Sequence, residues 1–394
     1  MATHVLDRGP QVRSRPTEDR FARIRQIDLV LIASTVSISL IGMVAVYAAT
    51  RTTAGVSPTY YLKRQVVFSV IGIVVMAVLA YIDYRRLEQW AYLVFGGLIV
   101  CLLGVFAFDK SEVTAGTGAS ASGVADRWIP LGPFQFQPSE FAMLGVIAVL
   151  ALYMTRHADE LDIRHLLPMF AMVAVPLLII VKQNDLGTAI VMVIVVLALL
   201  LVGGVKLRYI TGVVALGVLA FFLAIELHLV QSYQLDRLTN FLHPNTGRLS
   251  GNLQVDQAKI AIGAGGFSGT GLFHGVFTNG NYVPEQSTDF IFATVGEQLG
   301  FAGSAVIIGL YSVMALRILR AAQSARDGLG RLLCVGVLAF VGFSVFQNVG
   351  MNVGLMPVTG IPLPLISYGG SAIIVFYAAV GLVLNVEMRR GRTR

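Results

Sequence analysis

The sequence predicts an all-α, polytopic membrane protein with about ten transmembrane helices in a single domain. Hydrophobic residues make up 56% of its 394 residues and charged residues only 13%, whereas a soluble protein has roughly one half and one quarter. The mean hydropathy of +0.75 points the same way. Apolar runs of about the 20 residues that a spanning helix needs recur along the chain, so the soluble classes are excluded.

The spanning helices are expected where apolar runs lie between polar, glycine-rich or proline-rich connections. They cover residues 27–49, 65–82, 90–108, 139–153, 166–181, 186–202, 209–229, 290–316, 332–350 and 369–386. Residues 1–26 are polar and arginine-rich, so we expect a disordered basic cytoplasmic tail without a cleavable signal. The membrane domain then spans 27–386, and a second basic cytoplasmic tail spans 387–394.

The positive charges predict the orientation, because cytoplasmic loops retain lysine and arginine. With the N-terminus inside, 20 of the 29 lysines and arginines fall on the cytoplasmic side, so both termini are predicted to be cytoplasmic. This distribution accounts for the net charge of +7 without a nucleic-acid partner. Cys101 and Cys334 lie inside apolar runs, which indicates packing rather than a disulfide.

Three connections are predicted on the outer face, at 109–138, 230–288 and 351–368. The loop 230–288 far exceeds the usual connection length, so we expect it to be functional. Within this loop, the stretch NLQVDQAKIAIGAGGFSGTG predicts a short interfacial helix. The segment GLMPVTGIPLPLISYGG is apolar but rich in proline and glycine, so it is not a regular helix. Irregular backbone at membrane depth needs protein or a wet cavity around it, and we therefore expect a re-entrant segment beside a cavity.

Ionisable side chains gather at the predicted outer ends of the helices, where they are functional candidates because such groups are costly in a bilayer. They are Arg127, Glu140, Lys182, Asp185, Asp289 and Glu297. Asp289 is the central candidate because it lies where a polar loop becomes an apolar run. Ser287 and Thr288 are able to cap a helix, so Asp289 is expected in a first turn, where the helix dipole favours a carboxylate. Glu297 would lie about 12 Å deeper on the same broad face.

Simpler explanations stand beside these hypotheses. Asp289, Glu140 and Asp185 also fit acids that merely begin helices. The glycines of the stretch 296–303 fit close contact between helices. The segment GAGGFSGTG lacks the spacing and the preceding strand of a dinucleotide site. The histidines show no metal-ligand spacing, so we assign no metal to them.

Several blocks of this sequence together resemble the SEDS family of bacterial envelope proteins, the group of RodA, FtsW and SpoVE. The blocks are RWIPLGPFQFQPSE (127–140), KQNDLGTA (182–189), YQLDRLTNFLHP (233–244), QAKIAIGAGGFSGTG (257–271), PEQSTDFIFATVGEQLGFAG (284–303) and NVGMNVGLMPVTGIPLPLISYGG (348–370). The wording VTGIPLPLISYGG is more similar to the RodA elongation branch than to FtsW.

The resemblance implies a ten-helix peptidoglycan glycosyltransferase that polymerises lipid II on the outer membrane face, together with a class B penicillin-binding protein. It places the catalytic acid of the family at Asp289. The other polar motif positions, which we expect to bind substrate, are Arg127, Glu140, Lys182, Asp185, Lys259, Glu297 and Ser367. Three positions depart from the family pattern: Met143 and Thr270 stand where lysines are usual, and Asn184 replaces a proline.

On this basis Asp289 is expected to take the proton from the acceptor 4-hydroxyl as a general base, in an inverting transfer. Arg127 and Lys182 would stabilise the departing diphosphate, alone or with a divalent cation such as magnesium or manganese. Two other classes of function fit the same residues. A lipid flippase would use broken helices and intramembrane acids, and a scaffold that recruits envelope enzymes would tolerate substitution of these side chains.

Overall fold

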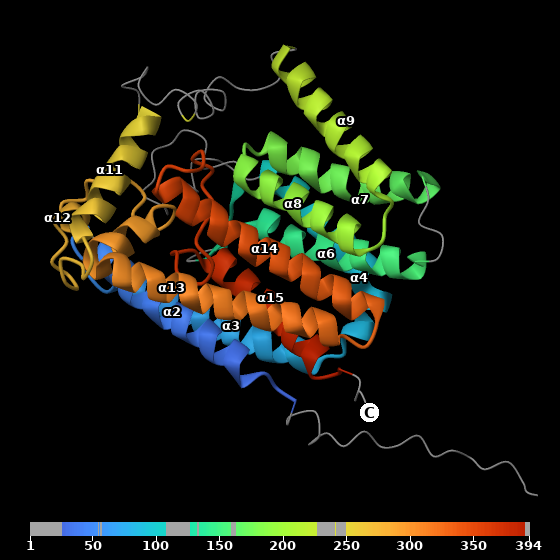
Figure 1. Cartoon of the computed structure of the whole chain (residues 1–394), viewed down its shortest axis with the longest axis horizontal. Helices are drawn as coiled ribbons and strands as arrows, with labels where there is room; N and C mark the ends of the chain where they lie inside the picture. Colours follow the sequence, from blue (N-terminus) through green and yellow to red (C-terminus); the bar gives the residue numbers. More distant parts are fainter. Residues whose placement is uncertain are drawn as a thin grey trace, which may run out of the picture.

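The computed structural model describes residues 26–53, 55, 57–107, 127–131, 134–158, 163–226, 241 and 250–390. Within these residues all the regular secondary structure is helical apart from one short hairpin (Figure 1). The longer helices are α2 (Leu29–Thr50), α3 (Tyr60–Tyr81), α4 (Leu87–Gly104), α6 (Pro138–Arg156), α7 (Ile163–Lys182), α8 (Leu186–Val202), α9 (Leu207–Glu226), α11 (Ser250–Gly265), α13 (Ile291–Ser324), α14 (Gly328–Asn352) and α15 (Gly370–Glu387). Residues 1–25 of the tail predicted at 1–26, residues 391–394 of the tail predicted at 387–394, most of the connection 109–138 and most of residues 230–249 of the connection 230–288 lie outside the described residues. Glu387, predicted in the tail, ends α15.

A helix lies over each stretch that was predicted to span the membrane. Eight of the described helices are long and apolar enough to cross a bilayer, whereas α8 has only 17 residues and the apolar part of α9 is also shorter. The interfacial helix predicted in the long loop corresponds to α11, which packs against α13. The hairpin of β1 (Ile129–Leu131) and β2 (Phe134–Phe136), in which Ile129 pairs with Phe136, was not predicted.

The centre of the bundle is α15, whose residues from Ser371 to Glu387 are all buried. It packs most extensively against α3. A side chain at Gly381 would meet the Met76 backbone oxygen at 2.7 Å, and one at Gly72 would meet the Tyr377 ring at 2.4 Å. Glycine therefore lets these two helices approach closely, as small residues do between membrane helices.

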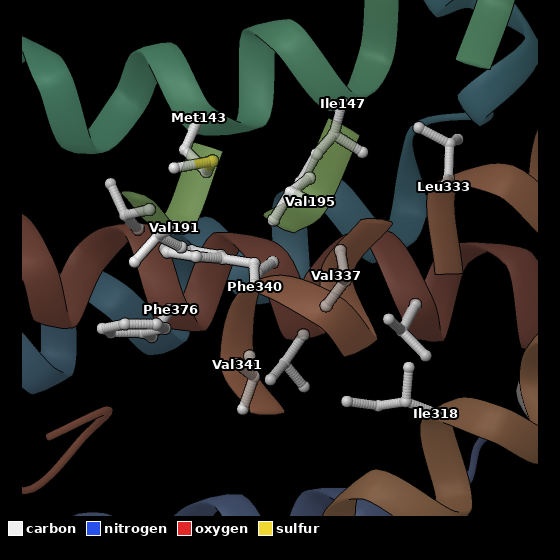
Figure 2. Close-up of a cluster of buried hydrophobic side chains, with 14 of the residues drawn as sticks. Met143, Ile147, Val191, Val195, Ile318, Leu333, Val337, Phe340, Val341 and Phe376 are labelled. Carbon is white, nitrogen blue, oxygen red and sulfur yellow. The ribbon is translucent and has the colours of Figure 1, made fainter. Parts of the chain in front are cut away.

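A cluster of apolar side chains joins α6, α8, α13, α14 and α15 (Figure 2). The rings of Phe340 and Phe376 are stacked with centroids 4.8 Å apart. Met143 and Ile147 of α6 point into the same cluster and are fully buried. Lipid is as apolar as these side chains, so close packing rather than transfer from water stabilises this contact.

The segment between α14 and α15 is irregular, as the sequence predicted, and its second half is largely buried, whereas Leu355 in its first half is exposed. A side chain at Gly42, in the middle of α2, would meet the Ile366 Cα at 2.6 Å, so this glycine lets the segment approach α2. The Tyr311 hydroxyl of α13 donates to the Pro364 carbonyl at 2.5 Å. A side chain of a neighbouring helix thus satisfies a carbonyl of buried irregular backbone.

Helix α13 is broken at Gly300, which has φ 64° and ψ −161°. A side chain there would meet the Gly269 nitrogen at 2.3 Å. The amides of Phe301 and Ala302 instead donate to the carbonyls of Gly266 and Phe267 at 2.9 and 3.0 Å. The glycine-rich stretch after α11 therefore completes α13 at its break. Gly300 therefore allows the close packing that the sequence predicted for it. A side chain at Gly303 would meet only Leu299 of the same helix.

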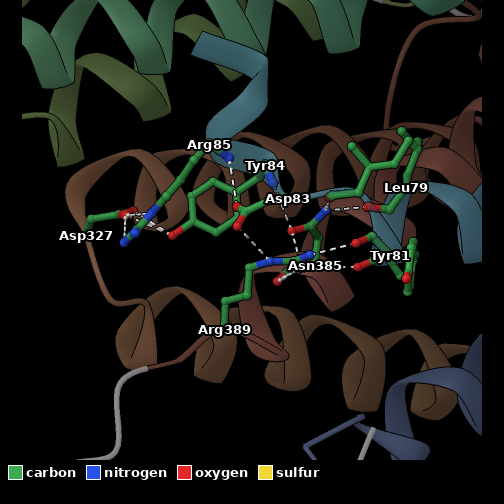
Figure 3. Close-up of polar contacts among 10 residues, drawn as sticks. Leu79, Tyr81, Asp83, Tyr84, Arg85, Asp327, Asn385 and Arg389 are labelled. Carbon is green, nitrogen blue, oxygen red and sulfur yellow. Dashed lines mark hydrogen bonds and ion pairs between the residues drawn. The ribbon is translucent and has the colours of Figure 1, made fainter. Parts of the chain in front are cut away.

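The two ends of the bundle differ in their polar contacts, and we name them by what they hold. The site end holds Asp185 and Asp289, and the tail end holds the start of α2 and the C-terminus of α15 (Figure 1). At the tail end, the Asn385 side chain donates to the carbonyls of Leu79 and Ile82 and accepts from the Tyr84 amide at 3.1 Å (Figure 3). These bonds join the end of α15 to the turn that follows α3.

Candidate functional site

Asp185 is the centre of a buried polar cluster at the start of α8. Its side chain accepts from the Thr188 amide and hydroxyl at 3.3 and 2.9 Å, so it caps the helix as first predicted for a simple helix-starting acid. The other helices also reach it, because Ser139 Oγ and Gln137 Nε2 donate to Asp185 Oδ2 at 3.1 and 3.2 Å. Asp185 is 2% exposed, and its carboxylate thus ties α6 to α8.

Arg127 supplies the positive charge of this cluster. Its guanidinium lies 3.7 Å from Asp185 Oδ1 and also donates to the Asn184 carbonyl. Asn184 has φ 59°, which asparagine tolerates better than most residues. Arg127 Nε is buried and has no hydrogen-bond partner in the described part of the chain. The structure therefore brings Arg127 and Asp185 together.

Lys182 lies apart from that ion pair. It ends α7 on the surface, with its ammonium 5.4 Å from the centre of the Phe106 ring. A cation over an aromatic face is stabilised by about 0.5–1 kcal/mol at an exposed site. The structure therefore places Lys182 at the rim of the cluster, facing an aromatic ring.

Glu140 is buried in the first turn of α6, near enough to Asp185 for their charges to interact. Among the described residues no cation pairs with it. Position 143, where a lysine is usual in the resembled family, lies one turn further along α6. Met143 is 0% exposed and packs in the apolar cluster of Figure 2, so this position contributes no charge to the site.

Asp289 lies just outside α13 rather than in its first turn, which corrects the sequence-based expectation. The helix begins at Ile291 with Phe290 as its N-cap residue. No neighbouring side chain in the sequence caps it, so neither Ser287 nor Thr288 has the predicted capping role, and the Thr288 hydroxyl donates back to Glu285 instead. Asp289 is partly buried, and its carbonyl accepts from Asn348 and Asn352 of α14 at 2.9 and 3.1 Å.

The backbone of Thr359 and Gly360 lies close to Asp289 and to the first turn of α8. A side chain at Gly360, which has φ 75°, would lie 3.3 Å from Asp289 Oδ2. A side chain at Gly187, in the first turn of α8, would lie 2.6 Å from the Thr359 carbonyl oxygen. Gly360 thus lets the irregular segment lie against Asp289, and Gly187 lets the same segment lie against the start of α8, the helix that Asp185 caps.

Glu297 is fully buried and its carboxylate is engaged in hydrogen bonds. It accepts from the amides of Phe277 and Thr278 at 2.7 and 2.8 Å and from the Thr278 hydroxyl at 2.5 Å. These donors form the start of the short helix α12 (Val276–Asn279), so Glu297 fixes that turn against α13. The structure gives Glu297 a structural role and does not join it to the Asp185 cluster.

The two remaining predicted residues, Lys259 and Ser367, lie near opposite ends of the irregular segment. Lys259 of α11 is 3.8 Å from Asp256, and its ammonium lies against Gly354. Ser367 is 2% exposed; its hydroxyl donates to the Thr288 carbonyl at 2.5 Å and accepts from the Leu363 amide at 2.8 Å. Ser367 therefore contacts the backbone beside Asp289 and has its hydrogen-bonding capacity filled.

Asn348, Asn352 and Gly360 belong to the site, although the sequence pointed to none of them. All three lie in the block 348–370, whose asparagines and glycines are a weak signal by themselves. No cluster of three or more histidine, cysteine, aspartate or glutamate side chains that would hold a metal occurs in the described ranges. Glu140 and Asp185 are two buried oxygen donors of like charge, which fits a hard divalent cation that also binds substrate phosphates.

Comparison with known proteins extends this picture over nearly the whole chain. A model of the FtsW, RodA and SpoVE family, described as cell cycle protein, matches residues 28–392. The probable peptidoglycan glycosyltransferase FtsW of Geobacter sp. (strain M18) is 34% identical over 375 residues, which are 93% of this chain and 98% of the relative. The peptidoglycan glycosyltransferase MrdB of Escherichia coli (strain K12) is 35% identical over 84% of this chain and 86% of its own length.

Solved structures agree with the sequence matches. A chain from a peptidoglycan synthase complex, in a structure described as the structural coordination of polymerization and crosslinking, matches with a TM-score of 0.75. It is 28% identical and the match covers 93% of this chain and 99% of that one. The rod shape determining protein RodA of Thermus thermophilus matches with a TM-score of 0.65 and 27% identity, over 92% and 97% of the two chains.

Proposed function

This chain belongs to the FtsW, RodA and SpoVE family of cell cycle proteins, and we propose that it is a peptidoglycan glycosyltransferase with Asp289 as its general base. As a multi-pass membrane protein it would act on lipid II, whose disaccharide is carried by a membrane-embedded lipid diphosphate. The match to the FtsW relative covers 93% of this chain and 98% of that relative, so the reaction class applies to the chain as a whole.

One observation carries the assignment of the base. The Asp289 carboxylate lies against Gly360, and the carbonyl of the preceding residue, Thr359, lies against Gly187, two residues after the Asp185 that pairs with Arg127. An acid and a cation are thereby held a short way apart at the same end of the bundle. Glycosyl transfer from a lipid diphosphate needs both, because a hydroxyl must lose a proton while a diphosphate gains negative charge.

In the proposed reaction the Asp289 carboxylate accepts the proton of the acceptor 4-hydroxyl. The hydroxyl oxygen forms a bond to the donor anomeric carbon, and the bond from that carbon to the diphosphate oxygen breaks. The leaving group departs from the opposite face, so the anomeric configuration inverts. A positioned general base typically contributes about 10²–10⁴-fold to the rate.

The leaving diphosphate is proposed to meet Arg127 and Lys182. Arg127 keeps one buried nitrogen without a partner among the described residues, although its other nitrogens are engaged. Lys182 at the rim is free to move from the Phe106 ring, since that contact is weak. Because Met143 is buried in the apolar cluster, these two cations take on more of the charge than in a chain with a lysine at that position.

Glu140 and Asp185 are the residues that we propose would hold a divalent cation, magnesium or manganese. When bound, the cation would supply positive charge for the departing diphosphate. Its removal by a chelator would lower polymerisation, and magnesium or manganese would restore it. Activity that is unchanged by chelation would leave the protein side chains as the whole source of compensating charge.

Three further proposals concern the orientation, the partner and the cellular role. The site end is proposed to face the outside of the cytoplasmic membrane, with both termini inside, since lipid II is used there. The partner is proposed to be a class B penicillin-binding protein, because a structural relative is part of a complex of polymerization and crosslinking. From the wording VTGIPLPLISYGG we propose a role in elongation; restored rod shape in cells lacking their own elongation polymerase would support it, and restored septation alone would contradict it.

The experiment that tests the function is glycan-chain synthesis from purified lipid II. The full chain, with its partner transpeptidase, is expected to produce glycan chains, and Asp289→Asn to produce none above background. A flippase would instead move lipid II across vesicles without lengthening chains, and a scaffold would leave both assays unaffected by the substitution. Full polymerisation by Asp289→Asn would overturn the assignment of the base.

A further inference from the structure

Three consecutive backbone carbonyls, those of residues 287–289, are held by donors from distant parts of the chain. The Ser287 carbonyl accepts from the Tyr368 amide at 2.9 Å, and the Thr288 carbonyl accepts from the Ser367 hydroxyl at 2.5 Å. The Asp289 carbonyl accepts from the two asparagine side chains of α14. We call the four donors, Asn348, Asn352, Ser367 and Tyr368, the carbonyl clamp.

The asparagines do more than bind one oxygen. Asn348 Nδ2 lies 2.9 Å from the Asp289 carbonyl and 2.8 Å from the Ile361 carbonyl, so it joins the base to the irregular segment. Asn352 Nδ2 lies 3.1 Å from the Asp289 carbonyl, while its Oδ1 accepts from the Ala293 amide at 3.1 Å. Both side chains are 0% exposed.

The local sequence explains why such a clamp is needed. Phe290 at the N-cap position has no polar side chain with which to satisfy the first amides of α13. Asn352 supplies the missing acceptor from another helix by binding the Ala293 amide. Asp289 precedes the cap, so the helix itself does not set its position. Donors from α14 and from residues 367–368 do so instead.

We propose that the carbonyl clamp positions the Asp289 carboxylate for proton transfer, so that Asn348, Asn352 and Ser367 are positioning residues for the reaction. This inference rests on the proposed function of Asp289. The clamp holds the main chain on one side while Gly360 lies against the carboxylate on the other. A displacement of about 1 Å at a reacting group lowers rates by as much as about 100-fold, so loss of a clamp bond should reduce turnover.

The competing explanation is that these hydrogen bonds only stabilise the fold, and Asn385 provides the matched control. It is an asparagine that is 1% exposed and donates to two backbone carbonyls at the end of α3, those of Leu79 and Ile82, at the tail end. Its removal should destabilise the protein to a similar extent without touching the site. The two explanations therefore predict different turnover for the variants but similar changes in melting temperature.

The experiment compares Asn348→Ala, Asn352→Ala and Asn385→Ala in the full chain with its partner, using purified lipid II at a temperature well below each melting point. Asn348→Ala and Asn352→Ala are expected to lower kcat about 10- to 100-fold with KM changed less than about threefold, because the loss is in the reacting geometry. Asn385→Ala is expected to keep kcat within about twofold. Amide exchange in residues 287–293 should accelerate in the first two variants only.

Each result distinguishes a positioning role of the clamp from a purely structural one. Turnover that is normal in both site-end variants would overturn the clamp, and equal losses of turnover in all three would assign the asparagines to stability alone. If the asparagine variants do not fold, Ser367→Ala serves in their place, with Ser367→Thr expected to restore turnover through its hydroxyl. An inactive Asp289→Asn beside fully active clamp variants would refute this inference alone, whereas an active Asp289→Asn would refute the proposed base.

Discussion

The two ends of the bundle use the same kinds of side chain in different charge settings. Each end has an aspartate that caps a helix and meets an arginine: Asp185 with Arg127 at the site end, and Asp327 with Arg85 at the tail end. Each end also has buried asparagine side chains that donate to backbone carbonyls. The shared parts show that capping and carbonyl contacts are general means of holding helix ends together in this protein.

The difference lies in the acids that remain. At the tail end several described acids pair with cations nearby, as Asp28 does with Arg317, Asp83 with Arg389 and Glu387 with Arg390. At the site end Glu140 is buried beside Asp185 without a cation of its own among the described residues, and Glu297 accepts only from neutral donors. Local ion pairs therefore hold the tail end together, whereas a buried acid without its own cation at the site end is suited to binding protons or cations.

The sharpest test of this comparison replaces one acid at each end. Asp289→Asn should lower polymerisation by about 10²–10⁴-fold because the proton acceptor is lost. Asp327→Asn should leave kcat within about twofold, because it changes only the tail end. The assay is glycan synthesis from lipid II with melting temperatures recorded in parallel. Comparable losses of activity in both variants would remove the distinction between the ends.

Loss of the Asn385 side chain should produce the largest effect on stability. Asn385→Ala leaves the carbonyls of Leu79 and Ile82 and the Tyr84 amide without this partner, so we expect about 3 kcal/mol of destabilisation. Thermal unfolding in detergent would measure it. Ser312→Ala is the control, because that exposed hydroxyl donates only within its own helix and should shift the melting temperature little.

Alanine substitutions at two glycines of the irregular segment distinguish the effect of backbone strain from an effect on the site. Gly360 and Gly354 have φ values of 75° and 78°, so alanine should strain both by about 1 kcal/mol. Only at Gly360 would the new Cβ lie against the Asp289 carboxylate; at Gly354 it would meet the flexible end of Lys259. We expect Gly360→Ala to lower kcat about tenfold and Gly354→Ala to spare it. Equal kinetics for the two would contradict the contact with Asp289.

The smallest expected effect is a dependence of tail-end stability on pH. Burial acts to raise the pKa of Asp327, but hydrogen bonds from the Gly330 amide, Tyr84 and Arg85 outweigh it, so the pKa lies below its ordinary value of 3.8. A lowered pKa contributes stability above pH 3.8 that is lost as the pH falls through the lowered value. The pair is partly exposed, so the contribution is small.

Melting temperatures of wild type and Asp327→Asn, measured between neutral pH and pH 3, check this prediction. The wild type should be the more stable protein at neutral pH, and the two curves should converge as Asp327 becomes protonated. Tyr84 stays neutral in this range, because burial and its bond to Asp327 raise the pKa of Tyr84 to about 12. Curves that stay parallel down to pH 3 would show that the Asp327 charge adds no stability.

The sequence was sufficient for the elements and for part of the site. Long apolar runs correctly predicted helices over their ranges, and the prolines and glycines of 351–368 correctly indicated irregular backbone. The sequence also singled out Arg127 and Asp185 as candidates, and the structure shows that they pair. The predicted first-turn place of Asp289 was wrong, because Phe290 rather than Ser287 or Thr288 precedes the helix. The hairpin at Ile129 was missed since its strands are only three residues long.

What the sequence by itself determined is therefore where the chain crosses the membrane and which side chains are too costly to lie there without a role. Only the tertiary structure decided which of them meet: Asn348 and Asn352 reach the Asp289 carbonyl from 59 and 63 residues away, Glu297 is engaged by α12, and Met143 faces the apolar cluster. The physical reason is that membrane helices are apolar on every side. Their periodicity does not mark the buried face, and packing alone selects the partners of each polar group.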